Sequence, residues 1–187
     1  LPNFVSCVRI LLAPVLFYLA LAQEPFWFLA TLLFSGFTDV LDGFLARGLN
    51  QISEVGSRLD SLGDFTIYST MAICAWILWP EIVVQELTAY TVIVISIIAP
   101  VIVGLIKCGS VTSYHTWLVK AAVVVTFAGY VLLFAGWLDW PFKLAAVFSA
   151  LAATEEIAIT LLSHHEHVDV RGVWVLLKEN KHDQTET

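Results

Sequence analysis

Charged residues are scarce in this chain. Of its 187 residues only 13% are charged, whereas 59% are hydrophobic, and the mean hydropathy is +0.84. This balance excludes an ordinary soluble domain, in which about a quarter of the residues are charged. Basic residues are fewer than acidic ones, giving a formal net charge of −7, and we expect no nucleic-acid partner. The composition instead predicts a protein that resides in a lipid bilayer.

Cysteine is also rare. The three cysteines, Cys7, Cys74 and Cys108, are far apart and lie in apolar sequence. An odd number at such spacing excludes a disulfide framework, and it does not match the ligand spacing of a zinc site. We interpret all three as packing residues.

Long apolar stretches are abundant, and short polar breaks separate them. A helix needs about 20 apolar residues to cross the hydrocarbon core of a bilayer. Six spans are predicted, at about residues 5–22, 26–48, 53–79, 86–106, 115–137 and 141–163. Pro100 is expected to kink the fourth. The sequence thus predicts an all-α polytopic protein with six transmembrane helices in one membrane domain (1–165) and a polar cytoplasmic tail (166–187).

The few basic residues predict the orientation. Most fall toward one side of the six-span arrangement, namely Arg9, Arg47, Arg58, Lys107, Lys120, Arg171, Lys178 and Lys181, while Lys143 lies on the other. Because basic residues favour the cytoplasmic side, both termini and the second-to-third and fourth-to-fifth connections are predicted to face the cytoplasm. We expect a multi-pass protein of the cell (inner) membrane.

Four aspartates stand out in this apolar setting. Asp39 and Asp42 are three residues apart, and Asp60 and Asp64 are four apart, so each pair shares one face of a helix. The break between the second and third spans is short, so these helices are expected to be antiparallel neighbours whose polar faces meet near the cytoplasmic side.

Carboxylates this close repel one another strongly at low dielectric unless cations neutralise them or some are protonated. A divalent metal is the simplest solution, and all-oxygen ligation favours magnesium or manganese over zinc. Ion pairing with Arg47 and Arg58 is the alternative for a single aspartate. For the whole set, the family resemblance described next favours the metal site.

The spacing resembles the signature of the CDP-alcohol phosphotransferase family: Asp, two residues, Asp-Gly, two residues, Ala-Arg, eight residues, Gly, three residues, Asp, three residues, Asp. Here it is filled by Asp39, Asp42, Gly43, Ala46, Arg47, Gly56, Asp60 and Asp64. The N-terminal Pro2-Asn3, Ser6 and Arg9 resemble the opening pattern of the same family, with Ser6 in place of threonine. The six-span layout also fits that family.

The resemblance implies transfer of a phosphate-linked group from a CDP-alcohol to an alcohol, with CMP leaving. It implies that Asp39, Asp42, Asp60 and Asp64 bind two Mg²⁺ (or Mn²⁺) ions and that Asp64 is also the general base. The implied CDP pocket comprises Asn3, Arg9, Gly43, Arg47, Gly56 and Ser57. A homodimer with its active site at the cytoplasmic side is expected as well.

The acceptor alcohol is predicted from the start of the fifth span. CDP-diacylglycerol as donor and glycerol 3-phosphate as acceptor are the leading choice, and the candidate acceptor residues are Lys107, His115, Thr116 and Lys120. The alternative is that these cations simply extend toward lipid phosphates. Where phosphatidylglycerophosphate synthases resemble Gly-Lys, one residue, Lys-Thr, this chain has Ser113-Tyr114-His115-Thr116. Inositol phosphate, serine or an amino alcohol therefore stay open as acceptors.

Two other classes of protein share some of these features. Intramembrane acids also mark transporters and ion pathways, but no inverted repeat is evident. A catalytically inactive scaffold is expected to lack a signature acid, and none is missing. Glu155 and Glu156 have either an acceptor-side or a packing role, and the His164–His167 segment is interpreted as an interfacial polar cap rather than a metal cluster.

Overall fold

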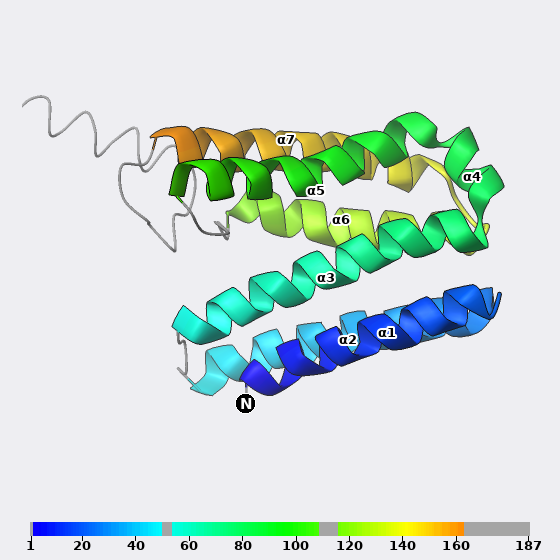
Figure 1. The fold of residues 1–187 in the computed structure, drawn as a ribbon, viewed down its shortest axis with the longest axis horizontal. Coiled ribbons are helices and arrows are strands. Elements are labelled where there is room, and N and C mark those ends of the chain that lie inside the picture. Colours follow the sequence, from blue (N-terminus) through cyan, green and yellow to red (C-terminus); the bar gives the residue numbers. More distant parts are fainter. Residues whose placement is uncertain (1, 50–53, 109–115, 163–187) are drawn as a thin grey trace, which may run out of the picture. The chain divides into compact units, whose positions relative to one another are not determined.

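The fold is helical throughout the described part of the chain. The computed structural model describes residues 2–49, 54–108 and 116–162, and within them the side chains of 10–38, 63–107 and 116–161. In chain order the helices are α1 (Pro2–Leu21), α2 (Pro25–Leu49), α3 (Glu54–Leu78), α4 (Pro80–Gln85), α5 (Leu87–Cys108), α6 (Trp117–Phe134) and α7 (Trp140–Leu162) (Figure 1). The predicted all-α class is therefore confirmed for these residues.

The six long helices coincide with the six predicted spans. Three of them carry segments that are long and apolar enough to cross a membrane, at Leu87–Lys107, Trp117–Phe134 and Trp140–Leu161. Shorter apolar segments of α1, α2 and α3 lie at Ile10–Leu21, Pro25–Thr38 and Gly63–Leu78. By length and composition the chain thus has membrane-length helices, and the full count of six spans stays a prediction.

The short helix α4 was not predicted. Pro80 was expected only to end the third span, but it also begins this six-residue helix. Proline suits a first helical position because its missing N–H would have no partner there and its φ is already helical. Val83 anchors α4, with 1% of its surface exposed.

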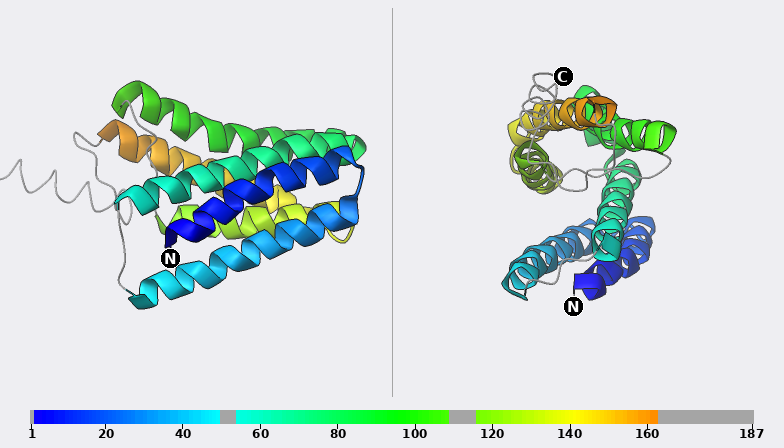
Figure 2. Two further views of the ribbon diagram at one scale, coloured as in Figure 1. Left: turned by 60° about the horizontal axis from the view of Figure 1, so that its bottom comes forward. Right: turned by 90° about the vertical axis from the view of Figure 1, so that its left-hand side faces the viewer.

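The chain divides into two compact units, residues 1–85 and 86–187. In the first unit, α1 packs along both α2 and α3, and α4 packs against α3 (Figure 2). The core between these helices includes Leu16 and Ala20 of α1, Phe28 of α2 and Cys74 of α3, all with no exposed surface. The contacts described for this unit thus include both pairings of α1. The predicted meeting of the polar faces of α2 and α3 falls on side chains outside the described ones and stays a prediction.

The tight turn between α1 and α2 depends on Gln23. Its backbone has a φ of 55°, in the left-handed region that few non-glycine residues adopt. Its side-chain amide donates to the carbonyl oxygens of Ala20, at 3.3 Å, and of Ile77, at 3.2 Å. The second bond ties the turn to the end of α3, and it offsets the conformational cost.

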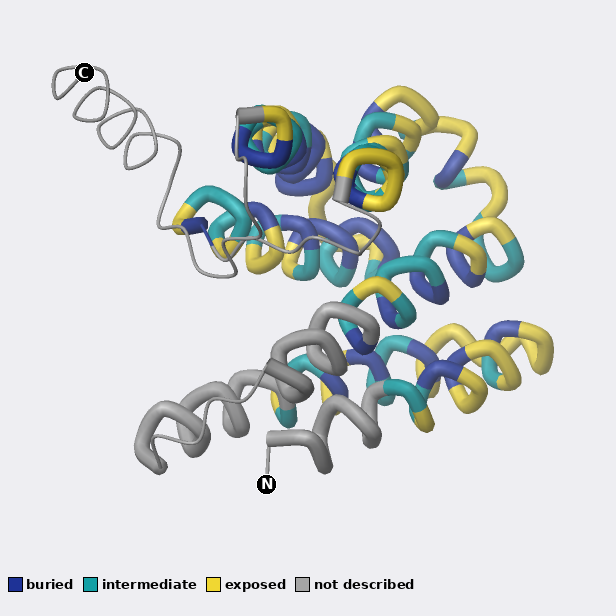
Figure 3. Tube along the Cα trace, turned by 60° about the vertical axis from the view of Figure 1, so that its left-hand side comes forward, coloured by how far each residue is buried: buried dark blue, intermediate teal, exposed yellow. Residues whose placement is uncertain are grey.

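In the second unit, α7 packs against both α5 and α6. Buried and exposed positions alternate around these helices (Figure 3), as expected where one side faces protein and the other faces lipid. The α6–α7 contact is close at Gly129, where an added Cβ would lie 2.9 Å from the carbonyl oxygen of Pro141. A buried hydrogen bond between the hydroxyls of Thr126 and Ser149, at 2.9 Å, joins the same two helices.

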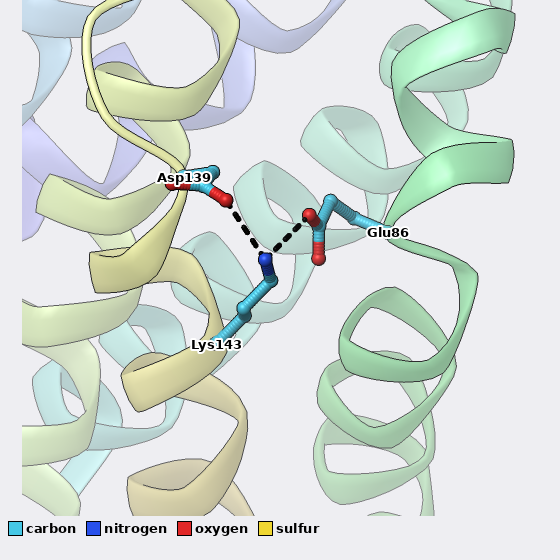
Figure 4. A network of polar contacts seen from close by, with 3 residues as sticks. All are labelled: Glu86, Asp139 and Lys143. Carbon is cyan, nitrogen blue, oxygen red and sulfur yellow. Dashed lines mark hydrogen bonds and ion pairs between the residues drawn. The ribbon is translucent and has the colours of Figure 1, made fainter.

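A charged network lies where α5 and α7 begin. The ammonium of Lys143 contacts Glu86 at 3.0 Å and Asp139 at 2.8 Å (Figure 4). The hydrogen bond from Lys143 lowers the pKa of Asp139 below its ordinary value. Lys143 is the lysine predicted to lie on the non-cytoplasmic side, and that side stays a prediction; the two carboxylates offset its charge.

Candidate functional site

The signature aspartates all lie within helices of the first unit. Asp39 and Asp42 belong to α2, and Asp60 and Asp64 belong to α3. Because both segments are continuous α-helix, spacings of three and four residues place each pair on one helical face, as predicted. The side chains of Asp39, Asp42 and Asp60 lie outside the described ones, so their role as metal ligands stays a prediction.

Asp64 is the signature acid whose side chain is described. It is half-buried and follows the buried Gly63. From this point α3 buries one face, which includes Ile67, Thr70 and Met71. Asp64 is therefore partly exposed, at the edge of the packed face of α3.

The residues implied for the CDP pocket fall on the same three helices. Asn3 and Arg9 belong to α1, Gly43 and Arg47 to α2, and Gly56 and Ser57 to α3. Their side chains lie outside the described ones. The packing of α1 on both α2 and α3 explains how an N-terminal pattern and the central signature belong to one compact unit.

The candidate acceptor residues lie in the second unit. Lys107, in the last turn of α5, donates to the carbonyl oxygens of Thr160, at 2.8 Å, and of Leu161, at 2.7 Å. These carbonyls belong to the last turn of α7, where a helix has unpaired acceptors and favours a cation. Lys107 thus caps α7, a structural role that its position in the sequence did not indicate.

Thr116 and Lys120 lie at the start of α6. Thr116 is the N-cap: its hydroxyl oxygen accepts a hydrogen bond from the backbone N–H of Val119 at 3.2 Å. Lys120 is exposed, and its ammonium lies 5.5 Å from the ring centroid of Trp117. This arrangement fits a lysine near a membrane interface as well as an acceptor ligand. His115 lies outside the described residues.

The structure adds a contact that the sequence analysis did not predict. The hydroxyl of Thr116 donates to a carboxylate oxygen of Glu155 at 2.8 Å, which links α6 to α7. A threonine directly before an apolar helix is a recognisable N-cap, but its partner 39 residues away was not detectable from local patterns.

Among the described side chains, no group of three or more His, Cys, Asp or Glu residues is placed to hold a metal ion. Three of the four predicted metal ligands fall outside that search. The same holds for the His164–His167 segment. The donor chemistry of the aspartates, and the helical spacing that the backbone gives them, fit a magnesium or manganese site.

Comparison with known proteins identifies the class that these features define. The sequence profile of the CDP-alcohol phosphatidyltransferase family matches residues 1–164. The chain belongs to this family, as its signature predicted.

Three relatives illustrate the range of the family. Over 160 residues the chain is 32% identical to a cardiolipin synthase (CMP-forming) of Streptomyces coelicolor, covering 79% of this chain and 71% of the relative. Over 73 residues it is 40% identical to a CDP-diacylglycerol–glycerol-3-phosphate 3-phosphatidyltransferase of Aquifex aeolicus, covering 38% and 41%. Over 74 residues it is 46% identical to rat cardiolipin synthase (CMP-forming), covering 39% and 24%.

The matches to the rat and Aquifex proteins therefore span about a quarter and two fifths of those relatives' lengths. No solved structure matches the chain.

Proposed function

We propose that this chain transfers a phosphatidyl group from CDP-diacylglycerol to an alcohol and releases CMP. The observation that carries the proposal is the complete aspartate signature on α2 and α3, within a chain that belongs to the CDP-alcohol phosphatidyltransferase family. The names of the Aquifex and Streptomyces relatives support this reaction class and a place in phospholipid synthesis.

Asp39, Asp42, Asp60 and Asp64 would hold the divalent ions, with Mg²⁺ as first choice and Mn²⁺ as second. The bound metal would offset negative charge on the diphosphate and on the departing CMP. Arg47 would pair with a phosphate of the donor, because its guanidinium matches phosphate oxygens. Gly43 and Gly56 would leave room for the nucleotide, and Asn3, Arg9 and Ser57 would complete the pocket.

Asp64 is proposed as the general base. An alcohol is a weak nucleophile at neutral pH, and a positioned carboxylate that accepts its proton contributes about 10²- to 10⁴-fold to the rate. The signature position of Asp64, one helical turn after Asp60 on α3, supports this role. The hydroxyl oxygen of the acceptor alcohol attacks the phosphorus distal to cytidine, its proton passes to Asp64, and the bond between that phosphorus and the oxygen of CMP breaks so that CMP leaves.

The acceptor is proposed to be a glycerol linked to phosphate, with glycerol 3-phosphate as first candidate. The Aquifex relative's name supports that choice. The Streptomyces relative supports a second, because cardiolipin holds two phosphatidyl groups on one glycerol, so that forming it with release of CMP requires phosphatidylglycerol. Inositol phosphate, serine and amino alcohols are the further alternatives.

The proposal includes the membrane arrangement. We propose six spans, cytoplasmic termini and a cytoplasm-facing site in the cell membrane, which the basic-residue pattern and the three membrane-length helices support. The proposed homodimer rests on the family resemblance. Cysteine accessibility scanning in intact cells would test the orientation, and crosslinking in the membrane would test the dimer.

The deciding experiment incubates the purified protein with radiolabelled CDP-diacylglycerol, Mg²⁺ and each acceptor in turn, followed by chromatography of the lipids and CMP. We expect CMP release together with phosphatidylglycerophosphate from glycerol 3-phosphate or cardiolipin from phosphatidylglycerol. Absence of CMP release with every acceptor, from protein that is folded and monodisperse, would refute the proposed activity and favour a transporter or an inactive scaffold.

A further inference from the structure

Thr38 is the last residue of the apolar segment Pro25–Thr38 on α2, and Asp39, the first signature acid, follows it directly. Its half-buried hydroxyl donates to the backbone carbonyl oxygen of Ser35 at 2.8 Å. Threonine hydroxyls inside helices commonly form such bonds, and the bonds often bend the helix. Because this bond lies immediately before a proposed metal ligand, its effect on the helix bears on the metal site.

The bond of Thr38 differs from those of three other described threonines. Thr70, Thr154 and Thr160 each donate to the carbonyl oxygen four residues earlier. In an α-helix that carbonyl already accepts from the N–H of the same threonine, so each bond stays within one pair of residues. Thr38 instead donates three residues back, to the carbonyl that the helix pairs with the N–H of Asp39. The hydroxyl of Thr38 and the backbone of Asp39 therefore share one acceptor.

Ser35, which supplies this acceptor, is fixed in the core of the first unit. It has 2% of its surface exposed, and Phe28 and Leu32, on the same face of α2, have none. Residues 28, 32, 35 and 39 are four, three and four positions apart, so Asp39 is the next position on this packed face. The carbonyl of Ser35 is thus a fixed reference point. A bend at this carbonyl shifts the turn that follows, which carries Asp39.

We propose that Thr38 is a positioning residue, which sets the direction of α2 through the shared carbonyl of Ser35 and so places Asp39 for metal binding. The inference rests on the proposed function, because it takes Asp39 as a metal ligand. Without the hydroxyl, the carbonyl would bond to the N–H of Asp39 alone, and the turn would relax toward a regular helix. Mg²⁺ requires nearly ideal octahedral geometry, whereas Ca²⁺ accepts flexible geometry, so a displaced ligand should weaken Mg²⁺ binding more.

The test measures metal binding directly, by electron paramagnetic resonance of Mn²⁺ added to the full chain in detergent with CMP present. Thr38→Val removes the hydroxyl and keeps the β-branched shape, and Thr38→Ala removes it with a residue that favours helices. We expect both variants to bind Mn²⁺ about tenfold more weakly than wild type, the lower end of the effect of losing an outer-shell partner. The dissociation constant for Mg²⁺, measured by displacement of Mn²⁺, should rise more than that for Ca²⁺. Thr38→Ser keeps the hydroxyl and should restore the affinities.

The dependence of turnover on Mg²⁺ gives a second readout. At low Mg²⁺, Thr38→Val should release CMP more slowly than wild type. At saturating Mg²⁺ its kcat should return to within about twofold of the wild-type value, because the substitution weakens metal binding and leaves Asp64 in place as the proposed base. A general loss of structure would instead lower kcat at every Mg²⁺ concentration.

Two matched controls remove a threonine hydroxyl that bonds back within its own helix elsewhere. Thr70→Val removes a buried hydroxyl on α3, and Thr154→Val removes an exposed one on α7. Both should bind Mn²⁺ as wild type does. If Thr38→Val keeps the wild-type affinity, or loses no more than Thr70→Val, the inference is wrong while the proposed function stands. If wild-type protein binds no Mn²⁺, the inference fails with the metal site, and the proposed transfer fails only if no CMP is released either.

Discussion

The ammonium of Lys107 donates a hydrogen bond to the carbonyl oxygen of Thr160 at 2.8 Å, and so joins the last turn of α5 to the last turn of α7. A second bond, to Leu161, completes the cap. Lys107→Met should therefore lower the stability of the protein. Because Lys107 is exposed, we expect a loss of only about 1 kcal/mol, or an apparent Tm decrease of about 2–4 °C.

Thermal unfolding in detergent would measure this loss. Lys107→Arg keeps the charge and the donors, and it should recover most of the stability. A Lys107→Met protein with unchanged Tm but a raised acceptor KM would instead assign Lys107 to the acceptor.

Gly129 should tolerate no side chain. An added Cβ would meet the backbone of Pro141 and Phe142 at 2.9–3.0 Å, and backbone atoms cannot move aside as a flexible side chain can. Gly129→Ala is expected to cost about 1–3 kcal/mol by forcing α6 and α7 apart. Thermal unfolding of this variant beside Ala128→Val, at the adjacent exposed position, checks the expectation. Equal Tm values for the two variants would contradict the close packing.

Substitution of different signature acids should cause two different defects, one in turnover and one in binding. Asp64→Asn should abolish turnover while retaining CDP-diacylglycerol, because the base is removed but most metal ligands remain. Asp42→Asn should weaken binding of both metal and donor. Radiolabelled donor retained by the protein, measured alongside CMP release, distinguishes these outcomes. Normal turnover by Asp64→Asn would remove Asp64 from the proposed role.

Removal of divalent metal should stop the reaction. Chelation by EDTA is expected to eliminate CMP release, and added Mg²⁺ or Mn²⁺ should restore it, since four carboxylates form a hard-ion site. Zinc should be a poor substitute because it prefers nitrogen and sulfur ligands. Full activity after exhaustive chelation, with no metal bound by elemental analysis, would contradict the metal assignment.

The contact between Asp139 and Lys143 should give a small dependence of stability on pH. The hydrogen bond from Lys143 lowers the pKa of Asp139 from its ordinary value of 3.8. A carboxyl with a lowered pKa in the folded state contributes stability above its unfolded pKa, and this contribution is lost as the pH falls through the folded value. Asp139→Asn should therefore lower Tm slightly at neutral pH, and the difference should vanish under strongly acidic conditions.

A difference in Tm that persists unchanged below pH 3 would show that another contact is responsible. Both side chains are largely exposed, with 53% for Lys143 and 61% for Asp139, so the effect should also weaken at high salt.

The helices were predictable because hydrophobic segments of membrane length have few alternatives to a helix. The aspartate signature could also be recognised from the sequence, because the residues of each pair are only three or four positions apart within one helix. The short α4 was missed because six residues between two apolar stretches carry little periodic signal. The packing of α1 on both α2 and α3 was not predicted, because it depends on how three apolar faces combine and not on a local pattern.

The contacts of Lys107 and Thr116 could not be predicted from the sequence. Each was predicted as an acceptor ligand from its residue type and its position near the fifth span. The structure gives Lys107 a helix to cap and Thr116 a carboxylate partner, over separations of 53 and 39 residues. A polar residue near a helix end has several possible partners of similar energy, so the choice among them depends on which helices pack together.

The boundary between Gln85 and Glu86 has an evolutionary consequence. Every residue of the aspartate signature precedes it, while Thr116, Glu155 and the lysines near them follow it. Under the proposed function, substitutions of the candidate acceptor residues would fall in α5, α6 and α7 and would leave the helices that carry the aspartate signature unchanged. A chimera joined between residues 85 and 86 would combine the aspartate signature of one parent with the candidate acceptor residues of the other, and the alcohol that it uses would show which unit selects it.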